Sequence, residues 1–207
     1  MKPILLASSN AGKIREMRTL LNAHGYTVYG QDEQGIKGAE ESGSTFVENA
    51  LLKARHAAAI SGMASLAEDS GLCVPALQGV PGLFSARYAG PGATDAENNQ
   101  RLLEQMRALT GASRAAYYIA CMVFMESADD PAPIVAQGFW MGTIGKTLQG
   151  KGGFGYDPLF WPLGGARSAA EWTLAEKNQL SHRAHALRRL LAMLQERQAP
   201  QPLSESD

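Results

Sequence analysis

One short stretch, residues 64–71 (ASLAEDSG), constrains the fold of this chain more than any other. It begins as an apolar strand and runs directly into two carboxylates, a hydroxyl group and a glycine. Open α/β sheets bind ligands at the ends of their strands, so we expect Glu68, Asp69 and Ser70 at the rim of a sheet. The alternative is an acidic turn closed by Gly71, because turns are rich in Asp, Ser and Gly.

The composition is typical of a soluble globular protein, with 45% hydrophobic and 19% charged residues in a chain of 207. We expect a single domain over residues 1–197 and a flexible tail over residues 198–207, where two prolines occur without an apolar stripe. The net charge of −1 gives no basic surface, so neither a nucleic-acid polymer nor a membrane is an expected partner. A small anionic ligand held by a few local cations remains open.

Two features indicate the compartment. The apolar run at residues 4–7 is too short for a signal peptide, and no run reaches transmembrane length. Cys73 and Cys121 lie in apolar surroundings without metal-ligand spacing, which predicts buried thiols and no disulfide. Both features favour the cytoplasm.

The first polar segment lies between a strand and a helix. Residues 4–7 form a continuous apolar run typical of a buried strand, and the apolar spacing over residues 14–21 predicts a helix. Backbone N–H groups at the start of that helix, with a lysine beside them, suit a phosphate group. The alternative is a polar loop that only caps the helix. The segment consists of Ser8, Ser9, Asn10, Ala11, Gly12 and Lys13.

A second cation lies on the next predicted helix, which Thr45 and Glu48 start with a capping box. Lys53 follows Phe46 by seven residues, so its ammonium group projects close to the buried face. Because an unpaired buried ammonium is unfavourable, we expect Lys53 to extend to solvent, pair with a carboxylate or bind an anion.

The acidic pair Glu40-Glu41 precedes this helix. Acids in a solvated loop are the ordinary interpretation of such a pair. If the loop folds close to Asp69, Glu41 and Asp69 suit a magnesium ion, which binds one or two carboxylates together with substrate phosphates.

The second half of the chain predicts antiparallel strands. Apolar runs at residues 115–125 and 134–144 flank the turn Asp129-Asp130-Pro131, which indicates a long hairpin. Strands and helices alternate before it. The expected fold class is therefore α/β, with a mixed, partly antiparallel twisted sheet flanked by helices.

Two segments near the C-terminus suit a nucleoside. In the glycine-rich loop at residues 151–158, Phe154 and Tyr156 offer a flat surface for a base ring, or else cover the core. His182 and Arg183 open the last helix, where the macrodipole disfavours cations unless an anion or an acceptor is present. A solvated His-Arg pair is the alternative there.

Six motifs occur in one order along the chain: S-x-N-x-x-K, T-F-x-E-N-A-x-x-K-A, E-D-S-G-L, G-x-P-G-x-x-S-A-R-Y, G-G-F-G-Y-D-P and E-K-N-x-x-S-H-R. Through them the chain resembles the inosine triphosphate pyrophosphatase family, also called the non-standard purine NTP pyrophosphatases, from about residue 4 to residue 194. The resemblance implies a Maf/Ham1-type architecture with two lobes around a central cleft. It also implies a cytoplasmic, homodimeric, Mg²⁺-dependent enzyme that converts ITP, dITP and XTP to the monophosphate and pyrophosphate, removing deaminated purines from the nucleotide pool.

The resemblance further implies roles for single residues. Glu41 and Asp69 would hold Mg²⁺, Asp69 would accept a proton from the attacking water, and Ser70 would lie beside it. Residues 8–13 and Lys53 would bind the phosphates. The implied nucleoside pocket consists of Phe154, Gly155, Tyr156, Asp157, Lys177, His182 and Arg183. The chain departs from the family at Ser9, where glycine is usual.

Two other function classes use some of the same features. A nucleotide-binding sensor without turnover would use the glycines and the cations, but it would not need both Glu41 and Asp69. A general small-molecule phosphatase would release orthophosphate whatever the base of its substrate.

Overall fold

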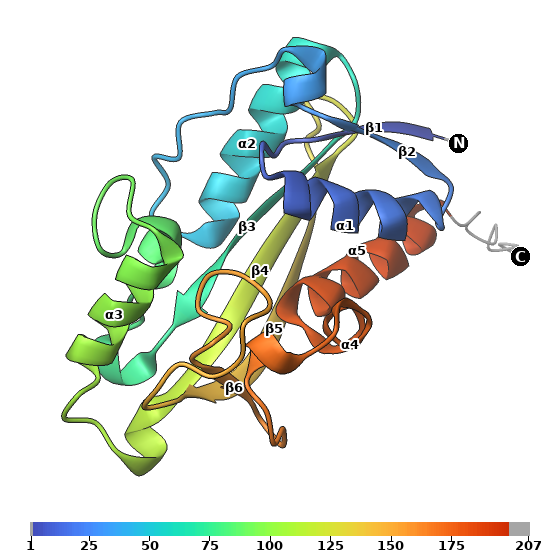
Figure 1. Cartoon of the computed structure of the whole chain (residues 1–207). Coiled ribbons are helices and arrows are strands. Elements are labelled where there is room, and N and C mark those ends of the chain that lie inside the picture. The colour runs from blue at the N-terminus through green and yellow to red at the C-terminus, as the bar shows by residue number, and fades with distance from the viewer. Residues whose placement is uncertain (1, 199–207) are drawn as a thin grey trace, which may run out of the picture.

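The apolar runs of the chain form one mixed sheet. The computed structural model describes residues 2–198, and its strands are β1 (Lys2–Leu6), β2 (Tyr26–Gly30), β3 (Ser65–Cys73), β4 (Ala115–Met125), β5 (Ile134–Ile144) and β6 (Phe160–Pro162). They lie side by side in the order β2-β1-β3-β4-β5-β6 (Figure 1). β1 is parallel to β2 and β3, whereas the pairs from β3 to β6 are antiparallel. This confirms the predicted mixed sheet and its long hairpin.

The predicted capping threonines start three of the helices, which are α1 (Ala11–Asn22), α2 (Phe46–Ser61), α3 (Asp95–Gln105), α4 (Leu174–Leu180) and α5 (His182–Gln198). Thr45, Thr94 and Thr173 each accept a hydrogen bond from the backbone N–H three residues further on. At α3 and α4 the glutamate returns the bond and completes the capping box. At α2, Glu48 instead accepts from the N–H of Ser44, at 2.7 Å.

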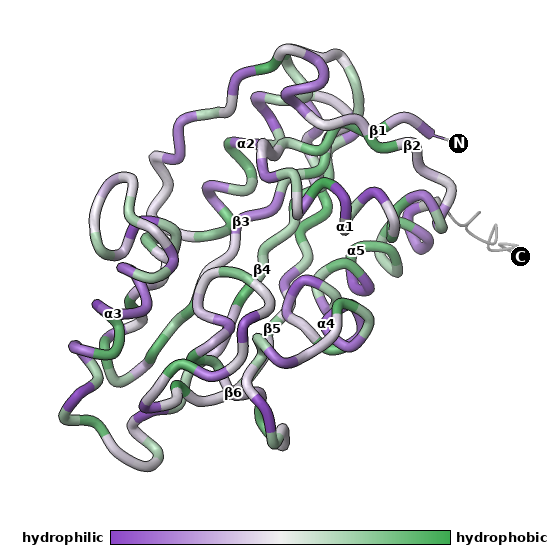
Figure 2. The backbone as a smooth tube through the Cα atoms, viewed as in Figure 1, coloured by the Kyte–Doolittle hydropathy of each residue, from purple (hydrophilic) through white to green (hydrophobic). Residues whose placement is uncertain are grey.

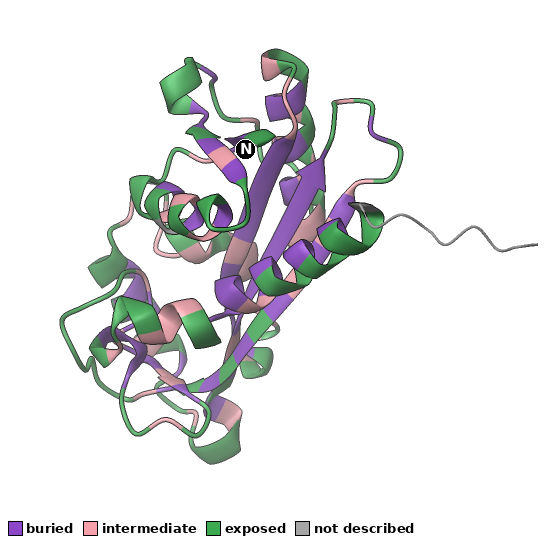
Figure 3. Ribbon diagram, turned by 90° about the vertical axis from the view of Figure 1, so that its right-hand side faces the viewer, coloured by how far each residue is buried: buried purple, intermediate pink, exposed green. Residues whose placement is uncertain are grey.

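The helices cover the two faces of the sheet unequally. α1 and α5 lie on one face, where Met122 and Leu190 are fully buried, and α2 lies on the other, against Val123 (Figure 1). Hydrophobic residues follow β4 along its length, and the central strands are almost wholly buried (Figures 2 and 3). Among the described helices, none is long and apolar enough to cross a membrane. The predicted tail lies outside the described residues, apart from Gln198 at the end of α5.

The prediction that the third strand ends at its carboxylates was wrong. β3 continues to Cys73, because β4 pairs with every residue of it. β1, in contrast, pairs only with Ser65 and Leu66 of β3. Within residues 2–198, Glu68 and Asp69 therefore have a neighbouring strand on one side only. They lie inside a strand and still at an open edge of the sheet, just beyond the point where β1 ends.

Gly138 determines how closely α5 packs against β5. A Cβ atom at this position would meet the backbone carbonyl oxygen of His182 and the backbone nitrogen of Ala186. Neither atom moves without shifting the first turn of α5, because both belong to the main chain. The absence of a side chain at residue 138 therefore places His182 and Arg183 against the sheet.

We expect Gly138→Ala to lower the free energy of unfolding by about 1 to 3 kcal/mol, the usual effect of forcing a methyl group into a packed site. Urea unfolding measures the change. Gly38→Ala is the matched control, because a Cβ there would lie 3.5 Å from the side chain of Gln31, an ordinary contact. Equal stability of the two variants would contradict the claim that Gly138 determines how closely α5 packs against β5.

Candidate active site

The predicted phosphate loop lies between the end of β1 and the start of α1. Asn10 caps the helix: its side-chain oxygen accepts from the N–H of Lys13 at 3.0 Å, and its own N–H donates to Ser8 Oγ at 3.2 Å. The first turn of a helix leaves N–H groups without partners inside the helix, so this end of α1 suits an anion. Ala11 and Gly12 belong to that turn.

Ser9 fastens this loop to the end of β2. Its hydroxyl group donates to the Asp32 carboxylate at 3.0 Å and accepts from the Gln31 side-chain amide at 2.8 Å. Gln31 is itself buried, and its backbone N–H donates to the carbonyl of Leu6 at 3.1 Å. Sequence reasoning missed Gln31 and Asp32, because no local pattern relates them to a loop more than twenty residues away.

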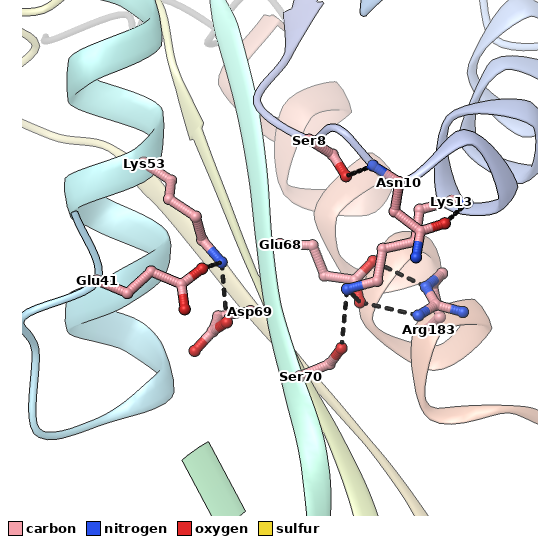
Figure 4. A network of polar contacts seen from close by, with 9 residues as sticks. All are labelled: Ser8, Asn10, Lys13, Glu41, Lys53, Glu68, Asp69, Ser70 and Arg183. Carbon is pink, nitrogen blue, oxygen red and sulfur yellow. Dashed lines mark hydrogen bonds and ion pairs between the residues drawn. The ribbon is translucent and has the colours of Figure 1, made fainter. Parts of the chain in front are cut away.

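On the α2 side of β3, one ammonium group joins two carboxylates. Lys53 Nζ donates to Glu41 Oε1 at 3.0 Å and to Asp69 Oδ1 at 2.8 Å (Figure 4). Of the three outcomes expected for Lys53, the structure has the ion pair. Burial alone would lower the pKa of Lys53, but the charges and hydrogen bonds of Asp69 and Glu41 outweigh it and raise that pKa above its usual value.

Asn49 holds the second oxygen of the Asp69 carboxylate. Its amide nitrogen donates to Asp69 Oδ2 at 3.3 Å, and its amide oxygen accepts from the N–H of Gly43 at 2.8 Å. The buried Asn49 thereby ties the loop that carries Glu41 to β3. The sequence signal for this role is a polar residue next to Ala50 on the inward face of a helix.

On the opposite side of β3, Glu68 pairs with two cations. Its carboxylate accepts from Arg183 Nε at 2.8 Å and from Arg183 Nη2 at 3.1 Å, and Lys13 Nζ lies 3.4 Å from it (Figure 4). Lys13 also donates to Ser70 Oγ at 3.2 Å. Burial would raise the pKa of Glu68, but Arg183 and Lys13 together hold it well below its usual value. Glu68 is therefore a buried anion, a role that sequence reasoning did not assign to it.

These two networks meet in one cavity at the open edge of β3. Its volume is about 340 Å³. Predicted site residues on its wall are Ser8, Ser9, Asn10, Lys13, Glu41, Lys53, Asp69 and Ser70. Arg87, from the predicted S-A-R-Y motif, adds a cation that had been given no role. The cavity thus combines a helix N-terminus, three cations and the carboxylates of β3.

The predicted nucleoside residues lie outside this wall, around the glycine-rich loop. Asp157 accepts from the N–H of Phe154 at 3.0 Å and from Lys177 Nζ at 2.6 Å. Gly155 is tied to α3, because its N–H donates to Asp95 at 2.6 Å. Phe154 is 58% exposed, and the Arg183 guanidinium lies 5.9 Å from the centre of its ring. Arg183 therefore connects this loop to Glu68 and, through it, to the cavity.

Four of the predicted nucleoside residues are buried: Tyr156, Asp157, His182 and Arg183. Tyr156 packs in the core and donates to the carbonyl of Ser85 at 2.8 Å, so its ring supports the loop and offers no flat surface to a base. His182 stacks on Tyr118, with ring centres 4.8 Å apart. Burial, and then the nearby charge of Arg183, hold the pKa of His182 well below its usual value, which keeps the imidazole neutral. Within the described residues its Nδ1 has no hydrogen-bond partner.

The donor set of Glu41 and Asp69 determines whether the pair suits a magnesium ion. Among the described residues, no three His, Cys, Asp or Glu side chains form a metal-binding group. Mg²⁺ needs fewer, because it usually binds one or two carboxylates and takes its other oxygens from water and phosphate. Glu41 and Asp69 lie within reach of one ammonium group, and both line the cavity. The residues therefore fit Mg²⁺ when it arrives with a phosphate ligand.

The model of the Ham1 family matches residues 4–193. The chain belongs to the Ham1 family. The chain is 45% identical to the dITP/XTP pyrophosphatase of Escherichia coli K12 over 194 residues, covering 94% of this chain and 98% of that one. It is 49% identical to the dITP/XTP pyrophosphatase of Methylococcus capsulatus over 185 residues, covering 89% of this chain and 92% of that one.

Solved structures of Ham1 proteins have the same fold. A HAM1 protein from Coxiella burnetii is 46% identical and superposes with a TM-score of 0.89, covering 95% of this chain and all of that one. A nucleoside-triphosphatase, dITP/XTP pyrophosphatase, from Mycobacterium abscessus is 38% identical with a TM-score of 0.76, covering 91% and 98%. The predicted Ham1-type architecture is confirmed.

We expect Glu68→Gln to lower the free energy of unfolding by about 3 kcal/mol at neutral pH, because the buried guanidinium of Arg183 loses the charge of Glu68. Urea unfolding measures this difference. Glu33→Gln is the matched control, since Glu33 forms an exposed ion pair with Arg18 and its removal should change stability little. A loss no larger than that of the control would show that the buried pair contributes no stability.

The difference in free energy of unfolding between wild type and Glu68→Gln should depend on pH. Folding lowers the pKa of Glu68, so its contribution is fully present above the unfolded value of about 4.3 and is lost as the pH falls through the lower folded value. The stability difference between wild type and Glu68→Gln should therefore persist down to about pH 4 and narrow in more acidic solution. A difference that disappears well above that pH would contradict the lowered pKa.

Proposed function

We propose that this chain hydrolyses ITP, dITP and XTP to the nucleoside monophosphate and pyrophosphate, as a Mg²⁺-dependent, homodimeric enzyme of the cytoplasm that removes deaminated purines from the nucleotide pool. The observation that carries the proposal is the cavity at the edge of β3, where a helix N-terminus and cations face a pair of carboxylates. Close identity to dITP/XTP pyrophosphatases over nearly the whole chain supports the same activity.

The triphosphate would bind the wall of the cavity that carries positive charge. Residues 8–13 offer backbone N–H groups at the start of α1, and Lys13 and Lys53 offer ammonium groups from two sides. Ser70 lies next to Lys13 and orients its ammonium group. These groups hold and neutralise the phosphate oxygens, which in phosphoryl transfer accounts for most of the catalysis.

Asp69 is the proposed base. Water attacks phosphorus, the bond to the leaving pyrophosphate breaks, and Asp69 takes the proton of the attacking water. Its Oδ1 accepts from Lys53 and its Oδ2 from Asn49, so the carboxylate has a fixed orientation in the cavity. Glu41 and Asp69 would hold Mg²⁺, which when bound supplies charge neutralisation on the phosphate oxygens. One Asp69 oxygen would bind the metal, and the other would orient the attacking water.

The base would lie against Phe154, whose ring is exposed beside the Arg183 guanidinium. Hypoxanthine and xanthine present a 6-oxo acceptor and an adjacent ring N–H, whereas adenine presents an amino donor and a bare nitrogen. Lys177 is a donor suited to the oxo group, and Asp157 is an acceptor suited to the N–H. Adenine would leave such a pair mismatched, at a cost of about 1 to 3 kcal/mol.

The pair of Glu41 and Asp69 also separates this proposal from its two rivals. A sensor that only binds nucleotides has no need of a buried carboxylate aimed at the phosphates. A general phosphatase has no need of the second group of residues around Phe154. Purified protein given ITP, ATP or GTP, with and without Mg²⁺, distinguishes the three through separate assays for pyrophosphate and orthophosphate.

We expect pyrophosphate from ITP only when Mg²⁺ is present. Little product should come from ATP, because of its mismatched base, or from GTP, because its 2-amino group is absent from hypoxanthine and xanthine. Asp69→Asn should lower kcat by about 100- to 10 000-fold, because it removes the base. Asp129→Asn, in the exposed turn of the hairpin, is the control and should retain activity. Orthophosphate from all three nucleotides would indicate a general phosphatase, and tight binding of ITP without product would indicate a sensor.

We expect Phe154→Ala to raise the KM for ITP by about tenfold while changing stability little, because the ring is exposed and stacking on a base contributes ~1–3 kcal/mol. Steady-state kinetics and thermal unfolding measure the two effects. Leu163→Ala removes a similarly exposed apolar side chain at the end of β6 and should change neither. An unchanged KM would remove Phe154 from the base pocket.

A further inference from the structure

Lys53 holds together three segments that are separate in the sequence. Its ammonium group bridges Glu41, in the loop before α2, and Asp69, on β3, while Lys53 itself lies on α2. The side chains of Lys53 and Asp69 are each only 13% exposed. The two contacts are short, and both acceptor atoms are carboxylate oxygens, so in the free chain the ammonium group occupies the space between the two acids (Figure 4).

Those oxygens are the ones that suit Mg²⁺. The ion requires ligand oxygens at about 2.0–2.1 Å, closer than the contacts of an ammonium group, and it carries two positive charges. An ammonium group in the same space would repel it and would already hold one lone pair of each carboxylate. The ion can bind these two oxygens, Glu41 Oε1 and Asp69 Oδ1, only after the Lys53 ammonium has moved.

In the same cavity, the Lys53 ammonium group can bind phosphate oxygens in place of the two carboxylates. Lys53 lines the same cavity as Ser8, Asn10 and Lys13, where a triphosphate would lie. Its ammonium sits on a flexible four-carbon chain and is a point charge with three rotatable donors, so it can turn from carboxylates to phosphate oxygens without a change in the backbone. A bound triphosphate supplies the negative charge that the departing ammonium would otherwise leave behind.

We propose that the Lys53 ammonium group is the counter-ion of Glu41 and Asp69 in the free chain. It prevents divalent cations from binding this pair until a triphosphate binds and the ammonium group moves to a phosphate oxygen. The inference rests on the proposed function and adds an order to it: the free chain binds divalent metal weakly, and metal and triphosphate bind with positive coupling. Because coupling is reciprocal, the metal strengthens nucleotide binding by the same factor. The same movement frees Asp69 Oδ1 for its part in catalysis.

Metal binding to the free protein tests this without any turnover. Mn²⁺ replaces Mg²⁺ as the probe, and electron paramagnetic resonance measures the unbound ion during titration of the folded, full-length chain. We expect Lys53→Met, which keeps most of the length of the side chain and removes its charge, to bind Mn²⁺ about tenfold or more tightly than wild type. Lys146→Met, at an exposed lysine, is the matched control and should bind Mn²⁺ as wild type does.

A second titration contains a non-hydrolysable ITP analogue with nitrogen between the α and β phosphorus atoms. In wild type the analogue should tighten Mn²⁺ binding more than it does in Lys53→Met, because only wild type has an ammonium group to displace. Lys53→Gln, which retains hydrogen-bond donors without the charge, should follow Lys53→Met, and it replaces that variant if Lys53→Met does not fold.

Equal Mn²⁺ affinity of wild type and both uncharged variants, without nucleotide, would overturn the inference. If wild type at the same time releases pyrophosphate from ITP, only the inference fails and the proposed function stands. If wild type neither hydrolyses ITP nor binds Mn²⁺ more tightly with the analogue, the proposed function fails as well.

Discussion

The ion pair between Glu68 and Arg183 joins residues 115 positions apart in the sequence, and most of the site depends on it. It fixes the first turn of α5 against β3, and Lys13 at the start of α1 shares the same carboxylate. Buried charges are tolerated only when they are paired and hydrogen-bonded. The positions of Glu68, Arg183 and Lys13 therefore depend on one another. Through them the phosphate loop and the glycine-rich loop at residues 151–158 are held in fixed positions relative to each other.

The alternation of a β-strand then divides the charges into two groups. Neighbouring residues of a strand point to opposite faces, so Glu68 faces α1 and α5 while Asp69 faces α2 (Figure 4). Each face supplies its own cations, Arg183 with Lys13 on one and Lys53 on the other. Because β1 stops short of this part of β3, both groups open into one cavity. A structural carboxylate and a proposed catalytic one can therefore be adjacent in sequence.

Features with a local cause could be predicted from the sequence. The capping threonines, the hairpin of β4 and β5 and the start of α5 each depend on residues within one turn or one strand of each other. Features set by partners far along the chain could not. The full length of β3 is set by its pairing with β4, and the roles of Glu68 and Gln31 depend on Arg183 and Ser9. The Tyr156 ring is buried by the core beneath its loop, which composition does not reveal.

We propose that the triphosphate occupies the cavity at the edge of β3 while the base lies beside Phe154. A crystal structure of Asp69→Asn with ITP and Mg²⁺ tests it most directly. The account predicts density for the phosphates against the first turn of α1, with the Lys53 ammonium group turned onto a phosphate oxygen and the hypoxanthine ring on Phe154. Phosphates bound elsewhere, or a base that points away from Phe154 into solvent, would contradict it.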